Sequence, residues 1–420
     1  MKLAPGTPLN IGLLTDENGA AFPVGRLAMA DGVAQLEWSP EALSSRLALA
    51  PIHYPPETGL IAARTREFEG LHGFLADSLP DAWGTLLLKR HLAKLGHPFE
   101  ELDAVDRLAL VGRRGRGALI FQPETLEEPD NASIDLDQLA NESHHFLLGE
   151  QTTLDELLTR LGGGSGGARP KVHLSFAADG SLLANDEMAG EGSSEWPEQW
   201  IVKFPALTDP PDIGPMEEAY ARMARAGGIV MAETRLISSA TGPGHFATRR
   251  FDRPGQGKRL HMISLGGALE AGPHMPSVDY DGFLSATLSI TRDMRDVEQA
   301  FRRMVFNILA HNRDDHARQH AFLMDEKGEW RLAPAFDLTC SHGPGGEHYM
   351  AVMGEGRAVT RAHAEALGAR HGIAPRRIVA IVEEVQAAIA EWRRIADACG
   401  VTVSLANVSM GLDKTAGSFA

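Results

Sequence analysis

The most informative segment of this chain is His311-Asn312-Arg313-Asp314-Asp315-His316, together with a second aspartate at Asp337. The residues before it are amphipathic with helical spacing, so Asp314 is expected on a loop that follows a helix. Gln319 comes five residues after Asp314. Two short alternating runs around the turn Asp325-Glu326-Lys327-Gly328 predict a hairpin between this loop and Asp337.

This spacing suits phosphoryl transfer. The reaction needs a carboxylate that accepts the proton of the attacking hydroxyl and oxygen ligands that hold Mg²⁺ against the phosphates. Protein kinases supply them as an Asp, an amide side chain five positions later and a second Asp after a hairpin. Asp314, Gln319 and Asp337 stand in that order and at that spacing.

Two other interpretations of the same segment stay open at this point. Asp314 and Asp315 could simply decorate a surface turn, which is the usual role of an isolated Asp-Asp pair. Alternatively, His311, His316 and His320 could join Asp314 in a zinc site, because clusters rich in imidazole bind that metal.

A glycine-rich run at 162–168 suggests where a nucleotide would bind. Its glycines allow backbone N–H groups to approach a phosphate closely, although flexible linkers have the same composition. Lys203 lies in a predicted strand, Trp200–Pro205, and Glu217 opens the next predicted helix. A lysine on an inner strand can neutralise phosphates while a glutamate holds it by an ion pair. The alternative for Lys203 is a surface lysine on an edge strand.

The rest of the chain predicts an α+β protein with a bilobal, protein-kinase-like order. Asp31-Gly32 between two alternating runs predicts a hairpin in a β-rich beginning. The polar, acidic residues 122–150 are expected to form a linker or a surface excursion, and Thr248–Asp252 is expected to form a strand. The chain after residue 256 is expected to be mainly helical. The predicted domains are 1–125, a β-rich unit with helices; 126–255, a lobe with the glycine loop; and 256–420, a helical lobe with the catalytic and metal-binding loops.

Composition limits the classes of function. The 420 residues are 43% hydrophobic and 23% charged, as in soluble globular proteins. A formal net charge of -16 argues against direct binding of nucleic acid. Cys340 and Cys399 have no metal-ligand spacing, and neither an apolar leader nor a membrane-spanning run is found, so we expect a cytoplasmic protein with no membrane partner.

Several separated segments resemble the HipA family of toxin-antitoxin kinases. The resemblance extends from about residue 10 to about residue 390. The matching segments are Val24–Leu27, Phe74–Asp81, Gly166–Lys171, Ile201–Pro205, Arg250–Arg253, Asn312–His316, Ala333–Leu338 and Gly343–His348.

The resemblance implies a bilobal kinase-like fold with an N-terminal β-barrel-like subdomain. It implies ATP and Mg²⁺ as cofactors and phosphorylation of Ser or Thr in a protein such as an aminoacyl-tRNA synthetase, which slows translation. It also implies a HipB-like helix-turn-helix antitoxin, through which the protein would reach operator DNA indirectly.

The resemblance also implies roles for individual residues. Asp314 would be the catalytic base, Gln319 and Asp337 the Mg²⁺ ligands, and Glu217 the ion-pair partner of Lys203. The backbone of Arg249 and Phe251 would meet adenine. The residues implied in ATP binding are Gly164, Ser165, Gly166, Gly167, Ala168, Lys171, Lys203, Arg249, Phe251 and His316.

The sequence departs from the family pattern at two places. The family usually has Asn where this chain has Gln319, and the extra methylene puts the strict Mg²⁺ geometry in question. Ser165 is a candidate for autophosphorylation, but its offset from Lys171 differs from the usual form. Two other functions therefore stay open: a catalytically weak antitoxin partner and co-repressor, and a small-molecule phosphotransferase.

Overall fold

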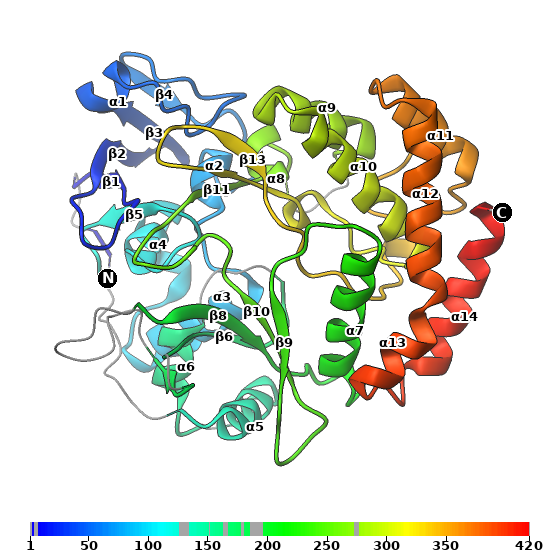
Figure 1. Cartoon of the computed structure of the whole chain (residues 1–420). Coiled ribbons are helices and arrows are strands. Elements are labelled where there is room, and N and C mark those ends of the chain that lie inside the picture. The colour runs from blue at the N-terminus through cyan, green and yellow to red at the C-terminus, as the bar shows by residue number, and fades with distance from the viewer. Residues whose placement is uncertain are drawn as a thin grey trace.

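The structure is a computed structural model that describes residues 2–3, 7–125, 134–150, 152–162, 167–177, 180–184, 196–272 and 277–419. Figure 1 shows two β-sheets on one side of the molecule, with most of the helices of the second half of the chain on the other side. The predictions for Gly164, Ser165 and Gly166 fall outside the described residues.

The N-terminal sheet is antiparallel, in the order β4-β3-β2-β1-β5. The predicted hairpin is confirmed, because Ala30 pairs with Val33, and Asp31 and Gly32 between them both have positive φ. β4 and β5 do not pair with each other in the described part of the chain, so this sheet is open rather than barrel-like. Its strands are β1 (Leu9–Leu13), β2 (Phe22–Ala30), β3 (Val33–Trp38), β4 (Leu60–Ala62) and β5 (Leu119–Gln122), and α1 (Pro40–Ser44) follows β3.

The helices of the N-terminal unit reach the rest of the protein. They are α2 (Gly73–Ala76), α3 (Ala82–Lys94), the short 3₁₀ helix η1 (Phe99–Glu101) and α4 (Ala104–Val111). The side chain of Asp81 caps α3 by accepting a hydrogen bond from the N–H of Gly84 at 2.7 Å. Trp83 and Leu87 of α3 then pack into the core of the next lobe, so that helix joins the two units.

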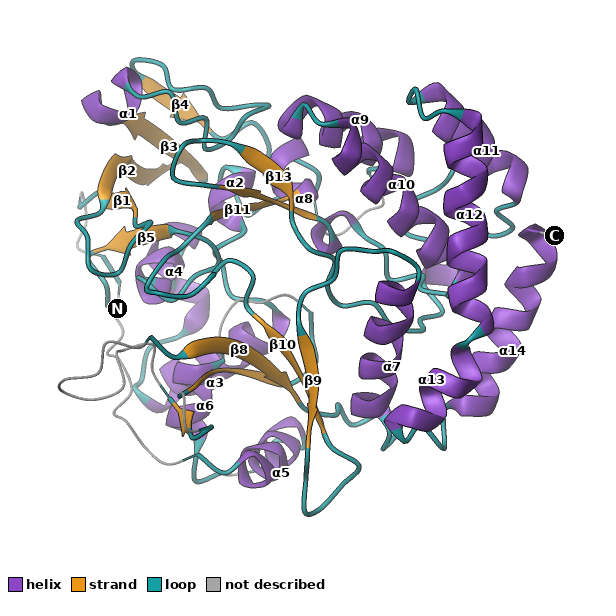
Figure 2. Cartoon of the chain, in the orientation of Figure 1, coloured by secondary structure: helices purple, strands orange, loops and turns teal. Residues whose placement is uncertain are grey.

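The second sheet has the order β7-β6-β8-β10-β9 and forms the N-lobe (Figure 2). Its strands are β6 (Lys171–Phe176), β7 (Leu182–Leu183), β8 (Glu198–Lys203), β9 (Thr234–Ile237) and β10 (His245–Arg249), and its helices are α5 (Leu136–Leu147), α6 (Asp155–Leu161) and α7 (Ile213–Ala226).

Two predictions for this lobe are wrong. The polar segment 122–150 is more than a linker or a surface excursion, because Leu139 and Phe146 give α5 an apolar face that packs into the core of the lobe. The strand expected over Thr248–Asp252 ends at Arg249 instead, and the chain then turns.

The C-lobe is mainly helical, as expected. Its helices are α8 (Leu265–Leu269), α9 (Tyr280–Thr291), α10 (Met294–Leu309), α11 (Arg361–Arg370), α12 (Pro375–Ala390), α13 (Trp392–Cys399) and α14 (Leu405–Ala416), with the 3₁₀ helices η2 (Ala317–Gln319), η3 (Pro344–Gly346) and η4 (Gly417–Phe419). In α10, Val297, Phe301, Met304 and Val305 are fully buried, which explains the helical spacing seen in the sequence.

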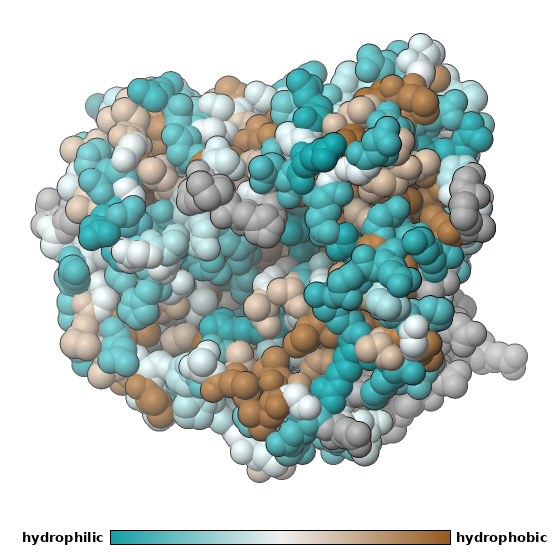
Figure 3. Space-filling model, turned by 180° about the vertical axis from the view of Figure 1, so that it is seen from behind, coloured by the Kyte–Doolittle hydropathy of each residue, from teal (hydrophilic) through white to brown (hydrophobic). Residues whose placement is uncertain are grey.

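The hairpin predicted before Asp337 is confirmed as β12 (Ala321–Met324) and β13 (Trp330–Leu332). The sequence did not reveal that β11 (His261–Ser264) adds a third strand beside β12. Hydrophilic residues cover most of the face seen in Figure 3, with smaller hydrophobic patches between them. Within the described ranges, none of the helices has the length and apolar character needed to cross a membrane.

Candidate active site

The loop after α10 is held in place by Asp315. This carboxylate is completely buried and accepts hydrogen bonds from the Tyr280 hydroxyl at 2.6 Å, from the Tyr349 N–H at 2.9 Å and from the ring of His348, whose Nδ1 lies 2.8 Å away. Asn312 adds a further hydrogen bond from the loop to the side chain of Asn307 on α10 at 2.9 Å. Asp315 is therefore an anchor, and its neighbour Asp314 remains available for chemistry.

Asp314 is oriented toward solvent, with 47% of its side chain exposed. Partial burial, helped by the nearby carboxylates of Asp337 and Asp315, raises the pKa of Asp314 to about 6 from its ordinary value of 3.8. A carboxylate with a pKa near the working pH is well suited to act as a general base. His316 lies beside it, with Nε2 at 3.8 Å from Oδ1 of Asp314.

Asp337 and Gln319 meet at the end of the hairpin. Gln319 Nε2 donates to Oδ2 of Asp337 at 2.8 Å, and Lys203 Nζ forms an ion pair with the other carboxylate oxygen. Burial alone would raise the pKa of Asp337, but Lys203 and Gln319 hold it well below the usual range. The amide and the carboxylate supply the oxygen donors that Mg²⁺ prefers, so this pair fits such an ion.

The histidines of the loop do not form a zinc centre. The ring of His320 packs on Phe283 at 4.1 Å between centroids, whereas the ring of His311 lies 5.9 Å from that of His342. Across the residues that the structure describes, no group of three or more His, Cys, Asp or Glu side chains is arranged to hold a metal ion.

Glu217 is shared by two cations. Its Oε2 lies 2.8 Å from Lys203 Nζ, and its Oε1 lies 3.0 Å from a guanidinium nitrogen of Arg169. The same guanidinium makes two contacts of 2.9 and 3.0 Å with Asp209. The sequence suggested the pair of Lys203 and Glu217 but not the role of Arg169, which immediately follows the glycine run.

Lys171, expected to contact ATP, forms an ion pair with the N-terminal unit. Its Nζ lies 3.2 Å from Oδ2 of Asp81, and both side chains are only 3% exposed. Burial lowers the pKa of Lys171, opposed by the Asp81 carboxylate. Gly167 stands close by: a Cβ on this glycine would lie 3.5 Å from Lys171 Nζ, and its φ of +84° suits glycine.

Lys171, Lys203 and Asp337 border a cleft between the lobes. The cleft is lined by apolar and by cationic side chains, among them Ile201, Phe251, Met262, Phe336, Arg116, Lys171 and Lys203. The rings of Phe251 and Phe336 lie 5.5 Å apart. The N–H of Arg249 already donates to the Glu233 carbonyl at 2.8 Å, so any contact of Arg249 with adenine would use its carbonyl or side chain. Apolar walls beside cations fit a nucleotide base and its phosphates.

The segment after β10 also fixes the N-terminal unit to the cleft. The buried carboxylate of Asp252 accepts hydrogen bonds from Arg250, from Arg253 and from the N–H of Gly117, each at 2.8 Å. Arg253 also donates to the Gly117 carbonyl at 2.7 Å. The motif Arg250–Arg253 is thus a structural junction, which spacing alone could not reveal.

Comparisons with known proteins agree with this arrangement. The family model described as HipA N-terminal domain matches residues 20–122, and that described as HipA-like C-terminal domain matches residues 163–392. The protein named "Putative kinase Y4mE" of Sinorhizobium fredii is 26% identical over 354 residues, which cover 76% of this chain and 78% of that protein. A "Putative kinase" of Haemophilus influenzae is 27% identical over 153 residues, or 33% of this chain and 44% of that protein.

A solved structure shows the same fold. It is that of the Shewanella oneidensis toxin-antitoxin system, a complex of HipA, HipB and operator DNA, which superposes with a TM-score of 0.68 at 17% identity. The match covers 97% of this chain and 96% of that one, which confirms the predicted α+β, kinase-like fold. With both family models matched over most of its length, this chain belongs to the HipA family.

Proposed function

We propose that this protein is an ATP- and Mg²⁺-dependent kinase that transfers the γ-phosphoryl group to a Ser or Thr hydroxyl of a protein. The observation that carries the proposal is that three elements meet around Asp337, one of the residues that line the cleft. They are the partly exposed Asp314, the pair of Gln319 and Asp337, and the pair of Lys203 and Glu217.

Each element has a task in phosphoryl transfer. Asp314 would accept the proton of the attacking hydroxyl, which its raised pKa favours. Gln319 and Asp337 would hold Mg²⁺, which when bound would neutralise charge on the phosphates. Lys203, kept in place by Glu217, would donate to a phosphate oxygen after exchanging its contact with Asp337 for the nucleotide.

The geometry at Gln319 supports activity despite the departure from Asn. Its amide already touches the Asp337 carboxylate at 2.8 Å, so the longer side chain reaches the position where a metal ligand is needed. Turning the amide about its last bond would direct its oxygen, instead of its NH₂ group, toward an ion bound there.

The partners proposed here follow from the family. A HipB-like helix-turn-helix antitoxin would neutralise the kinase and carry it to operator DNA, as the Shewanella complex contains both. The net charge of -16 supports contact with DNA through such a partner rather than directly. The proposed target is a protein of the translation machinery, such as an aminoacyl-tRNA synthetase, so the protein would act as a toxin.

The proposal is tested by incubating the purified protein with γ-labelled ATP, Mg²⁺ and a cell lysate, beside the variant Asp314→Ala. Label on a protein that disappears with the variant supports a protein kinase. The absence of label from every protein, including the chain itself, would overturn the proposal.

A further inference from the structure

His173 lines the cleft beside the lysines that are proposed to meet the phosphates. It pairs with Ile201 across β6 and β8, and Thr248 of β10 pairs with Ile201 from the other side, so the three side chains lie abreast on one face of the sheet. Lys171 and Lys203 form the neighbouring pair on that face, two residues away along the same strands. Since a strand rises about 3.3 Å per residue, the two rows lie roughly 6–7 Å apart.

This order along the sheet separates the two ends of a bound nucleotide. With Lys203 at the phosphates, as proposed above, the base would lie toward His173, because the cleft continues on that side along Thr248–Asp252. Phe251, one of the residues expected beside adenine, belongs to the same stretch. A base bound at this end of the cleft would therefore contact the imidazole ring of His173.

The tautomer of His173 is set by Arg250. A guanidinium nitrogen of Arg250 lies 3.3 Å from Nδ1 of His173, and because a guanidinium can only donate, Nδ1 must accept. Arg250 is itself held by the Asp252 carboxylate at 2.8 and 3.1 Å and by the Gly115 carbonyl at 3.2 Å. Burial and the charge of Arg250 lower the pKa of His173 well below its ordinary value of 6.5, so the ring is neutral. Its single N–H proton therefore lies on Nε2.

The Nε2–H group of His173 has no acceptor in the part of the chain that the structure describes, although the nitrogen is shielded from solvent. Buried donors in proteins are nearly always paired, because leaving one unsatisfied is costly. A base that enters the cleft offers the missing acceptor, since adenine has lone pairs at its ring nitrogens N1, N3 and N7.

We propose that His173 recognises the base of the nucleotide by donating a hydrogen bond from Nε2 to a ring nitrogen of adenine. The inference rests on the proposed kinase function and adds to it a residue that selects the base. It also gives the Arg250–Arg253 junction a second task, because Arg250 fixes the imidazole in the tautomer that can donate. The N-terminal unit, which meets this junction where the Gly117 N–H donates to Asp252, would thereby help to order the base site.

The test compares ADP with its 1-deaza, 3-deaza and 7-deaza forms, each of which replaces one ring nitrogen by a C–H group that cannot accept a hydrogen bond. Displacement of a fluorescent, non-hydrolysable ATP analogue from the full chain, with Mg²⁺ present, measures their affinities. We expect at least one deaza form to bind about three- to tenfold more weakly than ADP because it lacks the acceptor for His173. In His173→Phe, ADP itself should bind more weakly by a similar factor, and that deaza form should lose nothing further.

The substitution is chosen to keep the fold. Phe preserves the ring shape, and Arg250 retains its hydrogen bonds to Asp252 without the imidazole. His173→Leu removes the donor as well with a different shape, so the same comparison can be made with a second protein. Thermal unfolding of both variants checks that they are folded.

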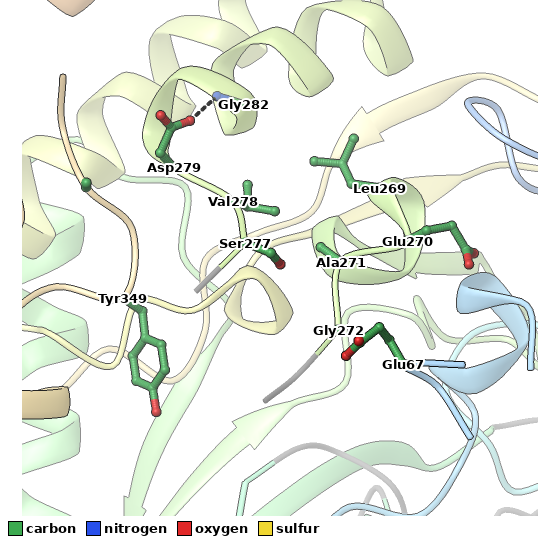
Figure 4. Close-up of a pocket in the computed structure, with 11 residues that line it drawn as sticks. Glu67, Leu269, Glu270, Ala271, Gly272, Ser277, Val278, Asp279, Gly282 and Tyr349 are labelled. Carbon is green, nitrogen blue, oxygen red and sulfur yellow. Dashed lines mark hydrogen bonds between the residues drawn. The ribbon is translucent and has the colours of Figure 1, made fainter. Parts of the chain in front are cut away.

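Two control variants lie outside the cleft. His144→Phe makes the same substitution at an exposed position of α5. Asp279→Asn lies in the separate pocket shown in Figure 4, whose described lining residues are all different from those of the cleft. Asn caps a helix about as well as Asp, so this change preserves the start of α9. Both controls should bind ADP and its deaza forms as the unaltered chain does.

Equal affinity of the unaltered chain for ADP and for all three deaza forms would overturn the inference. Deaza losses of the same size in the unaltered chain and in His173→Phe would overturn it too. Transfer of label from γ-labelled ATP beside either result would leave the kinase function standing. A deaza loss that depends on His173, without transfer of label to any protein, would support the base contact and overturn the kinase function. Failure of the unaltered chain to bind the ATP analogue would overturn both.

Discussion

Lys171 and Asp81 form a buried ion pair between the N-lobe and the N-terminal unit, with Nζ and Oδ2 3.2 Å apart. Asp81 also caps α3, whose Trp83 enters the N-lobe core. The N-terminal unit therefore contributes to the wall of the cleft that we propose binds ATP, through Arg116 and through the contact of Asp81 with Lys171.

This pair predicts a clear effect on stability. Asp81→Asn keeps the helix cap but leaves Lys171 as a buried charge without its carboxylate, so we expect a loss of about 3–5 kcal/mol in the free energy of unfolding. Denaturant titration measures it. As a control, Glu37→Gln in the exposed pair of Arg26 and Glu37 should cost about 1 kcal/mol or less. Similar values for the two variants would contradict the assigned role of the buried pair.

The raised pKa of Asp314 predicts the pH dependence of activity. The carboxylate must be ionised to accept a proton, so kcat/KM should rise with pH up to about 6 and then level off. Below that value it should fall about tenfold per pH unit. A profile that stays flat from about pH 5 to pH 8 would show that Asp314 does not act as the base.

The same shift predicts a gain in stability when Asp314 is neutralised. The folded state binds the Asp314 proton more tightly than the unfolded state does. The contribution of this residue to stability therefore falls as the pH rises from 3.8, the pKa of the carboxyl in the unfolded chain, to about 6, its pKa in the folded protein. Asp314→Asn should therefore unfold at a higher temperature than the unaltered protein at pH 7 but not at pH 3. If the two proteins differ in unfolding temperature by the same amount at pH 7 and at pH 3, the pKa of Asp314 is not raised by folding.

Glu217 and its neighbour Glu218 offer a matched pair of substitutions. Glu217→Gln removes the charge that holds Lys203 and should lower kcat/KM for ATP by about ten- to a hundredfold. Glu218→Gln removes an adjacent carboxylate that pairs with Arg222 at 2.7 Å instead, and should leave kcat/KM within about twofold. Steady-state kinetics with both variants measure the difference, and equal losses would point to a general defect of α7.

Gln319 predicts the metal requirement. Gln319→Ala removes the amide beside Asp337, so the Mg²⁺ concentration for half-maximal activity should rise by about tenfold or more. Gln319→Asn keeps the amide but shortens its reach. Its Mg²⁺ concentration for half-maximal activity should therefore lie between those of the unaltered protein and of Gln319→Ala. If Gln319→Ala leaves the Mg²⁺ dependence unchanged, this residue does not bind the metal.

The sequence was sufficient to predict the elements whose signals are local. The Asp31-Gly32 turn, the amphipathic α10 and the hairpin before Asp337 are all present. Each depends on the pattern or turn chemistry of a few neighbouring residues. The order and spacing of Asp314, Gln319 and Asp337 can likewise be read directly from the sequence.

The features that the sequence did not reveal depend on distant contacts. Asp81 and Lys171 lie 90 positions apart, and Gly117 and Asp252 lie 135 positions apart. Neither pair has a signal within its own segment. The helix α5 was missed because its polar composition conceals the few apolar residues that pack inward. The spacing to Gln319 singled out Asp314, but the sequence did not reveal that Asp315 anchors the loop, since its partners Tyr280 and Tyr349 lie 35 and 34 positions away.

Direct transfer of phosphate tests the central claim. The purified protein is incubated with a substrate protein found in the lysate experiment, with either γ-labelled or α-labelled ATP and Mg²⁺, and label on serine or threonine is measured for the unaltered chain and for Asp314→Asn. We predict transfer from γ-labelled ATP only, with a loss of about a hundredfold or more in the variant. Transfer at an equal rate by a folded Asp314→Asn protein, or label from the α position, would contradict it.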